Sequence, residues 1–302
     1  MICAVAAGSR AREFIRTGRF CSGDTRGTPE VYRFQNNSQQ SVLTYLQVFT
    51  GNSPMPYTEQ IVTSTHRWSD KTFSFKTTRP ADFHFENGEF VTIGLRPEGK
   101  LIARAYSIVS NNDADHLEFL SIHVPDGPLT SRLARIETGD SVWINSKATG
   151  SLTLKHVQPG RHLYLLATGT GLAPFVCLVR SPEIYDAFER VILVHTVRTV
   201  QELAYKNEIE SLASGRFHYV PCVTREAFQN NIRCSDLFKS GKLFSMTNSP
   251  HADPEQDRVL ICGNPDMVRD MREHLNQQGW TMTNHSGVGN YSVEKAFVVH
   301  HS

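Results

Sequence analysis

Short apolar runs recur between residues 57 and 157, and Gly, Asn, Asp and Pro separate them at spacings of about ten residues. The runs are rich in β-branched and aromatic residues, which is typical of strands. Leu129, Leu133 and Ile136 recur at helical spacing and predict one short helix after residue 128. Six short strands with no long helical pattern between them predict an antiparallel barrel or sandwich. The expected strands are residues 61–62, 72–78, 90–95, 105–109, 117–124 and 141–144.

The pattern changes near residue 158, where apolar strands begin to alternate with helical segments. Asn264 is placed as the N-cap of the last helix, Pro265 as its first residue and Gly279 just beyond its end. Buried strands that alternate with helices predict an open α/β fold with a parallel sheet. The expected strands are residues 163–167, 191–195, 217–223 and 259–262, and the expected helices are residues 174–180, 202–213 and 265–278.

The two patterns predict two domains, an antiparallel β-barrel over residues 57–157 and an α/β open parallel-sheet domain over residues 158–302. Residues 1–56 fit neither pattern and are expected to be an extension. The first fifty positions hold six arginines, no lysine and three acidic residues. This composition fits either a disordered segment or an organelle-targeting segment.

Composition narrows the class of function. The formal net charge is +1, so the chain lacks the overall basic field that marks nucleic-acid-binding proteins. No run of about eighteen apolar residues is present, which argues against a membrane span. The six cysteines include no CxxC pair, so we expect reduced thiols and no metal site. We expect a cytoplasmic location, with an organelle matrix as the alternative if the N-terminus is a targeting segment.

The stretch LLATGTGLAPF, over residues 165–175, is the most informative part of the α/β half. A buried strand ends in the turn TGTG, and a helix begins near Pro174. In an open parallel sheet, backbone N–H groups and the helix N-terminus meet a pyrophosphate at this kind of turn. Glycine suits the turn because a Cβ would block the approach of a ligand. The third glycine of GxGxxG is missing, so a purely structural turn remains an alternative.

Three arginines follow the next strands of the α/β half. Arg198 follows the second strand, in HTVR, Arg225 follows the third, in VTRE, and Arg233 lies eight residues later. Nucleotides bind at the carboxyl ends of the strands in open sheets. A charge-assisted Arg–phosphate contact contributes about 1.5–3 kcal/mol, so two such contacts favour NADPH over NADH by about two to four powers of ten. Each arginine taken alone is equally compatible with an ordinary solvated side chain.

Two motifs in the barrel half also carry candidate chemistry. The strand RAYS places Arg104 and Tyr106 on one face and Ser107 on the other. A guanidinium pairs with a pyrophosphate, and a tyrosine ring covers a flat aromatic ring. The segment DGPLTS, over residues 126–131, begins the predicted helix, where Thr130 supplies a hydroxyl beside a second anion site.

Taken together and in this order, the motifs resemble those of the bacterial ferredoxin/flavodoxin–NADP⁺ reductases over about residues 57–298. The motifs are RAYS, DGPLTSRL, ATGTGLAPF, VTRE, CGNP and VEKAFV. The resemblance implies an FAD-binding β-barrel domain followed by an NADP-binding α/β domain. It also implies hydride transfer from NADPH to flavin N5, and single-electron transfer between FAD and ferredoxin or flavodoxin. The cofactors then supply most of the chemistry.

The same resemblance implies roles for individual residues at the FAD site. Arg104 would hold the FAD pyrophosphate, Tyr106 would pack on the flavin, and Ser107 would hydrogen-bond near N5. Phe297 would stack on the flavin and yield when the nicotinamide arrives. The other residues implied for FAD are Ala105, Ile122, His123, Val124, Gly127, Leu129 and Thr130.

For NADP(H), the residues implied for the pyrophosphate are Gly169, Thr170 and Gly171, and those implied for the 2′-phosphate are Arg198, Arg225 and Arg233, with Thr224 beside them. Cys262 and Gly263 would lie beside the nicotinamide, with the thiol acting as a contact rather than as a nucleophile. The implied catalytic set is Tyr106, Ser107, Cys262 and Phe297.

The chain departs from the family pattern at three places. His123 stands where many members carry lysine, Thr196 stands where glycine is common, and the chain continues past Val298 as VHHS. Two other functions stay open: an NADPH–flavin reductase that serves an oxygenase, and a nucleotide-binding electron-transfer subunit without turnover. We expect a monomer with a ferredoxin or flavodoxin partner, for which a basic rim would consist of Arg132, Arg135, Lys147 and Lys155.

Overall fold

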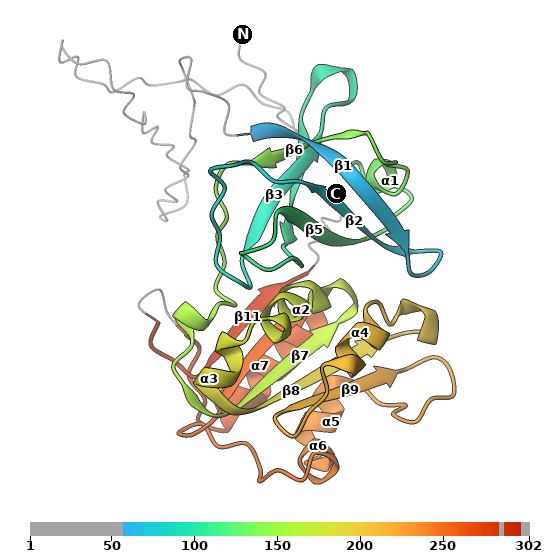
Figure 1. Ribbon diagram of the computed structural model, residues 1–302. Coiled ribbons are helices and arrows are strands. Elements are labelled where there is room, and N and C mark those ends of the chain that lie inside the picture. The colour runs from blue at the N-terminus through green and yellow to red at the C-terminus, as the bar shows by residue number, and fades with distance from the viewer. Residues whose placement is uncertain (1–56, 284–286, 297–302) are drawn as a thin grey trace, which may run out of the picture. The chain divides into compact units, whose positions relative to one another are not determined.

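The computed structural model describes residues 57–283 and 287–296, which form one antiparallel and one parallel sheet (Figure 1). The predicted fold class, an antiparallel barrel followed by an open parallel α/β sheet, is confirmed. The described residues belong to one compact unit that starts at Pro56. The predictions for residues 1–56 and for Phe297 lie outside the described residues.

Six antiparallel strands form the first sheet in the order β4-β3-β6-β1-β2-β5. Beyond the end of β4, Ile108 pairs with Phe119, and the N–H of Val109 donates to the carbonyl of Glu118. These bonds bring the two edge strands together and draw the sheet round into a barrel. The strands are β1 (Tyr57–Arg67), β2 (Thr72–Thr78), β3 (Phe90–Leu95), β4 (Ile102–Ser107), β5 (His116–Ile122) and β6 (Ser141–Asn145).

Strand β1 is much longer than the two residues predicted for it. Its first half pairs with β6 and its second half with β2, and the register shifts between Val62 and Ser64. The bulge lets one strand serve two neighbours as the sheet curves. Most residues of β1, such as Thr58 and Glu59, are polar and exposed, so the strand lacks the apolar run by which the other strands were predicted.

The barrel core is aromatic and aliphatic. The rings of Phe75 and Phe119 lie 5.4 Å apart at its centre. Leu129 and Leu133 enter the same core from α1 and the residue before it. Helix α1 spans only Thr130–Leu133, so the predicted helical spacing ends one turn earlier than Ile136. The short 3₁₀ turns of this half are η1 (Pro97–Gly99) and η2 (Leu154–His156).

The second sheet is parallel throughout and has the strand order β11-β10-β7-β8-β9. Its strands are β7 (Gly160–Thr168), β8 (Phe188–Val197), β9 (Phe217–Val223), β10 (Arg258–Gly263) and β11 (Tyr291–Lys295). Its helices are η3 (Gly169–Leu172), α2 (Ala173–Arg180), α3 (Glu183–Ala187), η4 (Val200–Glu202), α4 (Lys206–Ser211), α5 (Cys234–Lys239), α6 (Lys242–Met246) and α7 (Pro265–Gln277).

Side chains of the central strands alternate between two hydrophobic clusters, one on each face of the sheet. In β7, Leu163 and Leu165 enter one cluster together with residues of α2, whereas Tyr164 and Leu166 enter the other together with residues of α5 and α7. Apolar residues at consecutive positions are therefore all buried, which explains the unbroken runs in the sequence.

Most predicted helices of this half are present, with one correction. The predicted helix 202–213 is broken, because Tyr205 adopts a left-handed conformation with φ of 57° between η4 and α4. Helix α7 begins where predicted, and the Asn264 side chain accepts hydrogen bonds from the N–H groups of Asp266 and Met267. Gly279 follows its end with φ of 83°. In the part of the chain that the structure describes, no helix is long and apolar enough to cross a membrane.

Candidate functional site

Four strands of the parallel sheet end at one edge, and the predicted NADP-binding residues follow these ends (Figure 1). The turn 169–171 follows β7, Arg198 follows β8, and Thr224 and Arg225 follow β9. Gly263 is the last residue of β10. Because the strands are parallel, these residues share the edge at which open sheets bind nucleotides.

The turn after β7 leaves room for a ligand on one side. Gly169 is exposed and has φ of 54°, and a Cβ added there would meet no atom within 4 Å. η3 continues directly into α2, so the N–H groups of the first helical turn point away from the helix body. An open glycine at the start of a helix is the arrangement that accepts a phosphate.

The other side of the same turn packs tightly against β10. A Cβ on Gly171 would clash with the carbonyl group of Cys262, and a Cβ on Gly263 would clash with the Thr168 hydroxyl. That hydroxyl also accepts a hydrogen bond of 2.8 Å from the N–H of Asn264. The ends of β7 and β10 are thus held together by groups that leave no space for larger residues.

His195 lies directly beneath the turn and is fully buried. Its Nε2 lies 3.1 Å from the carbonyl oxygen of Gly169, which can only accept, so Nε2 carries the proton. Its Nδ1 lies 3.4 Å from the Tyr219 hydroxyl. Burial lowers the pKa of His195 from 6.5 to about 4, partly offset by the bond to Gly169. His195 is therefore a neutral hydrogen-bond donor that fixes the carbonyl group of Gly169. It was not among the residues predicted from the sequence.

The three predicted arginines are exposed at the sheet edge. The N–H of Arg225 donates to the carbonyl oxygen of Arg198 at 2.9 Å, which joins their two loops. Arg233 is the N-cap residue of α5, and the next N–H, that of Cys234, donates to the Thr196 hydroxyl at 3.0 Å. Thr196, which stands where glycine is common in the family, thus links the start of α5 to the end of β8.

In the barrel, β4 presents the predicted RAYS residues along an edge strand. Arg104 and Ala105 are exposed, and Tyr106 and Ser107 are half-buried. The Tyr106 hydroxyl lies 3.3 Å from the Ser121 hydroxyl on β5. Burial raises the pKa of Tyr106, with the Ser121 bond and Arg104 acting against the rise. The tyrosine is therefore a neutral, fixed ring on a surface with an exposed guanidinium.

The predicted second anion site follows β5. Ile122 is the last residue of this strand, two residues earlier than predicted, and His123 and Val124 lie in the loop that follows. The N–H of Gly127 donates to the Val124 carbonyl at 3.0 Å. A Cβ on Gly127 would clash with the Thr130 hydroxyl, so a larger residue there would displace this hydroxyl. The Leu129 side chain is buried in the barrel core, so a phosphate contact there would come from its backbone N–H.

Cys262 and Glu294 lie in register on neighbouring strands β10 and β11. Burial, followed by the Glu294 charge, raises the pKa of the Cys262 thiol well above its usual value, so the thiol is neutral. The Glu294 carboxylate accepts hydrogen bonds from the N–H and hydroxyl of Ser151, at 2.8 and 3.3 Å. Burial raises the pKa of Glu294, and the Ser151 bonds act against this rise.

Glu294 was not among the predicted site residues. The sequence contained a signal for it, because Glu294 belongs to the motif VEKAFV. It also directly follows the strand-like residues Tyr291–Val293.

The helix that begins at the TGTG turn ends on the barrel. Arg180, the last residue of α2, donates to the Val109 carbonyl at 2.9 Å and to the Glu118 carboxylate at 3.2 Å. Its remaining nitrogens form a bidentate pair with Glu208 on α4, at 2.6 and 2.9 Å. The hydroxyl of Tyr205, where the predicted helix 202–213 is broken, donates to the second oxygen of Glu118 at 2.9 Å. This network around the buried Glu118 carboxylate links the two halves and was not predicted.

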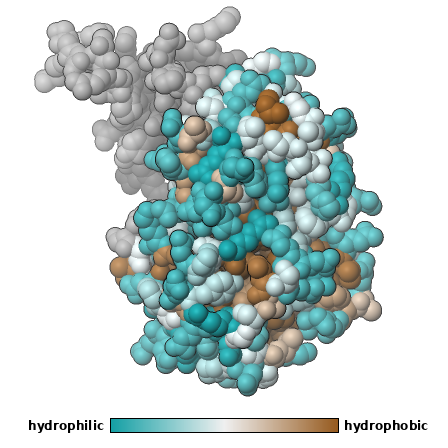
Figure 2. Space-filling view, in the orientation of Figure 1, coloured by the Kyte–Doolittle hydropathy of each residue, from teal (hydrophilic) through white to brown (hydrophobic). Residues whose placement is uncertain are grey.

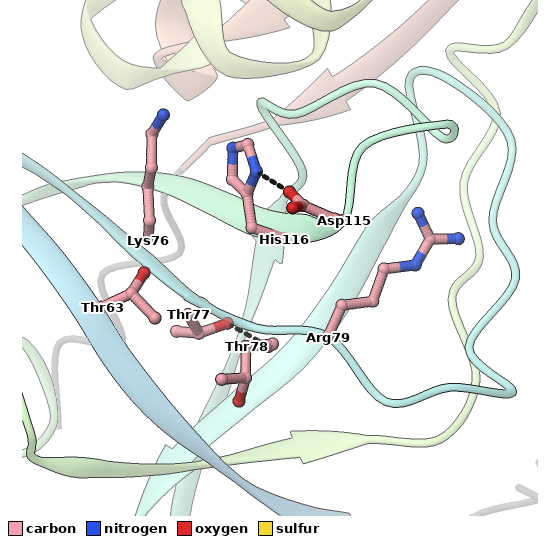
Figure 3. A pocket seen from close by; sticks show the side chains of 7 residues that line it. All are labelled: Thr63, Lys76, Thr77, Thr78, Arg79, Asp115 and His116. Carbon is pink, nitrogen blue, oxygen red and sulfur yellow. Dashed lines mark hydrogen bonds and ion pairs between the residues drawn. The ribbon is translucent and has the colours of Figure 1, made fainter.

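A separate hollow lies on the barrel and contains none of the predicted site residues. It is lined by Thr63, Lys76, Thr77, Thr78, Arg79, Asp115 and His116 (Figure 3). The Arg79 guanidinium already donates to the carbonyls of Phe83, Asn112 and Ala114, and His116 bonds to Asp115. Because these polar groups already have partners within the protein, we assign no ligand to the hollow. Among residues 57–283 and 287–296, no three His, Cys, Asp or Glu side chains are grouped to hold a metal ion.

Comparison with known proteins agrees with this division of the chain. Residues 59–152 match the family of oxidoreductase FAD-binding domains, and residues 165–273 match the family of oxidoreductase NAD-binding domains. The first range covers nearly all of the barrel strands. The second range includes the TGTG turn and all three predicted arginines.

Relatives match over nearly their whole length. The ferredoxin–NADP reductase of Azotobacter vinelandii is 47% identical over 248 residues, which are 78% of this chain and 96% of the relative. The flavodoxin/ferredoxin–NADP reductase of Rhodobacter capsulatus is 43% identical, over 79% of this chain and 93% of the relative. A ferredoxin NADP⁺ reductase from Neisseria gonorrhoeae, solved with bound FAD and NADP, has a TM-score of 0.76 at 32% identity and covers 80% of this chain and 99% of that chain. The chain therefore belongs to the ferredoxin–NADP reductase family.

Proposed function

We infer that the protein is an FAD-dependent oxidoreductase that uses NADPH and exchanges single electrons with ferredoxin or flavodoxin. One observation carries this inference: an FAD-binding barrel and a nucleotide-binding parallel sheet, with arginines at its edge, occur in one chain that is 47% identical to a ferredoxin–NADP reductase. Bound NADPH supplies a hydride, and bound FAD converts this two-electron chemistry into one-electron transfer.

We propose that the barrel residues hold FAD in the roles predicted for them. The exposed Arg104 guanidinium would pair with the pyrophosphate, and Tyr106, fixed by Ser121, would cover the flavin ring. The Gly127 turn supports this assignment, since a Cβ there would meet the Thr130 hydroxyl that faces the same turn. Thr130 would add a hydroxyl to the same cradle.

On the α/β side, we propose that the turn 169–171 binds the NADP(H) pyrophosphate and that Arg198, Arg225 and Arg233 bind the 2′-phosphate. Cys262 and Gly263 would border the nicotinamide, with the half-buried Glu294 beside Cys262 on the next strand. The neutral Cys262 thiol supports a contact role, because a nucleophile needs a thiolate.

We propose that the electron carrier binds basic side chains on the barrel through complementary charge. Arg132, Arg135 and Lys147 are exposed, whereas Lys155 pairs with Glu86 at 2.7 Å and is a weaker candidate. Figure 2 shows one face of the molecule, where hydrophilic residues predominate and apolar residues form small separate groups. Exposed cations on a mainly hydrophilic surface suit a transient, electrostatically steered partner. We further propose that the protein works as a monomer in the cytoplasm, and that residues 57–157 and 158–302 are its two domains.

The test of this function compares acceptors. NADPH oxidation by the purified holoenzyme is measured with ferricyanide and with free flavin as the acceptor. In a third assay, ferredoxin or flavodoxin is the acceptor, and the reduced carrier is detected because it reduces cytochrome c. The proposal expects carrier-dependent cytochrome c reduction at a rate well above that with free flavin. Turnover with free flavin alone would favour the alternative, a flavin reductase serving an oxygenase. Bound flavin without any turnover would favour a non-catalytic subunit.

Charge reversal tests the carrier surface separately. The double variant R135E/K147E should raise the KM for the carrier severalfold and leave ferricyanide reduction unchanged. The matched control is K242E/R272E, which reverses two exposed charges on the α/β half. An unchanged carrier KM in R135E/K147E would refute this surface.

A further inference from the structure

Two loops carry Arg198 and Arg225 at the edge of the parallel sheet, and hydrogen bonds join them. The N–H of Thr224 donates to the Val197 carbonyl at 3.1 Å, and the N–H of Arg225 donates to the Arg198 carbonyl at 2.9 Å. Two strands that end side by side are thus continued by one pair of bonded loops.

A carboxylate extends this connection beyond the strand ends. Glu226, next to Arg225, accepts a hydrogen bond of 2.8 Å from the N–H of Val200, two residues beyond Arg198. Within the first loop, Glu202 accepts a bond of 3.0 Å from the N–H of Arg198. The loop that carries Arg225 is held by Asn231, whose side-chain amide donates to the carbonyls of Val223 and Glu226 at 3.0 and 2.6 Å.

These carboxylates bind main-chain N–H groups and not the neighbouring guanidinium groups. In the described part of the chain, no hydrogen bond or ion pair joins the side chain of Arg198, Arg225 or Arg233 to Glu202 or Glu226. An arginine already paired with a carboxylate would have to exchange that partner for a phosphate. The main-chain bonds therefore hold the loops in place and leave the guanidinium groups available.

We propose that Glu226 is a positioning residue for recognition of the 2′-phosphate of NADPH. Its carboxylate fixes the Arg198 loop against the Arg225 loop, so that the two arginines are held together before the nucleotide binds. The inference rests on the proposed use of NADPH at this edge. Pre-ordering of the loops saves part of the entropy that binding would otherwise cost.

The carboxylate has two opposite effects on the nucleotide. Its hydrogen bond favours binding by ordering the loop, and its negative charge opposes the binding of a phosphate nearby. At a separation on the order of 8 Å in water, removing one such charge tightens the binding of a doubly charged phosphate by about two- to fivefold, less at high salt. Loss of one hydrogen bond weakens binding by about two- to tenfold.

Two uncharged variants separate these effects. E226Q removes the charge but keeps an oxygen that accepts from Val200, whereas E226A removes both the charge and the bond. The KM for NADPH should fall about two- to fivefold in E226Q, and the KM in E226A should be about two- to tenfold higher than in E226Q. For NADH, which lacks the 2′-phosphate, kcat/KM should be nearly the same in both variants. The control is E273Q, which removes an exposed charge on α7.

The assay is steady-state reduction of ferricyanide by the holoenzyme with NADPH or NADH. Equal KM values for NADPH in E226A and E226Q would overturn the proposal. A difference between the two variants that is as large with NADH would also overturn it, because the loop would then serve nucleotide binding in general. Wild-type enzyme that does not prefer NADPH would instead contradict the proposed function, whatever the variants do.

Discussion

Acidification is expected to weaken the α/β half through His195. This side chain is fully buried and donates from Nε2 to the Gly169 carbonyl, while Nδ1 faces the Tyr219 hydroxyl. The native state therefore keeps the ring neutral, and burial lowers its pKa from 6.5 to about 4. In the unfolded chain the ring takes up a proton near its ordinary pKa, so the unfolded state binds more protons between these two values.

The magnitude follows from the two pKa values. Stability from this group is fully present above pH 6.5 and is lost as the pH falls toward 4. A shift of one pKa unit corresponds to about 1.36 kcal/mol, so the whole shift is worth about 3 kcal/mol. Between pH 7 and pH 5, the free energy of unfolding should fall by about 2 kcal/mol through His195 alone.

The assay is urea unfolding of the holoenzyme, followed by circular dichroism, at pH 7 and pH 5. H195Q keeps a donor for the Gly169 carbonyl but does not titrate, so it should lose about 2 kcal/mol less stability than the wild type over this range. H84Q, at an exposed histidine, is the control and should behave as the wild type does. Equal losses in H195Q and the wild type would refute the reasoning.

Three further predictions concern contacts around the site. G171A should lower the free energy of unfolding by about 1–3 kcal/mol, because the new methyl group clashes with the Cys262 backbone; urea unfolding beside G215A, where the space is open, checks this. R180M should cost about 3 kcal/mol by leaving the buried Glu118 charge without its cation, and R180M/E118Q should recover part of that loss in the same assay. T196G should raise the KM for NADPH about two- to tenfold by freeing the start of α5, whereas T196S, which keeps the hydroxyl, should not.

The sequence predicted the parts of the fold in which local pattern and burial agree. The strands of the parallel sheet are continuous apolar runs because both faces are buried, and α7 carries its cap and its terminal glycine at the expected positions. The TGTG turn, Arg198 and Arg225 were placed at one sheet edge because parallel strands must end together.

Other features depend on contacts between distant segments, which a local pattern does not reveal. Strand β1 is polar on its outer face, and the break at Tyr205 is fixed by Glu118 across the chain. His195 and Glu294 acquire their roles from hydrogen bonds to Gly169 and Ser151, which are distant in the sequence. Helices α3, α5 and α6 have only five or six residues each, too few to show a helical period.

The central claim is that one chain binds FAD and reduces it with NADPH in preference to NADH. The most direct measurement is the absorbance spectrum of the purified protein, followed by anaerobic titration with each nucleotide. The account predicts a flavin spectrum at one FAD per chain that NADPH bleaches quickly and stoichiometrically, and NADH only slowly. A protein that takes up no FAD, or whose flavin NADPH does not bleach, would contradict it.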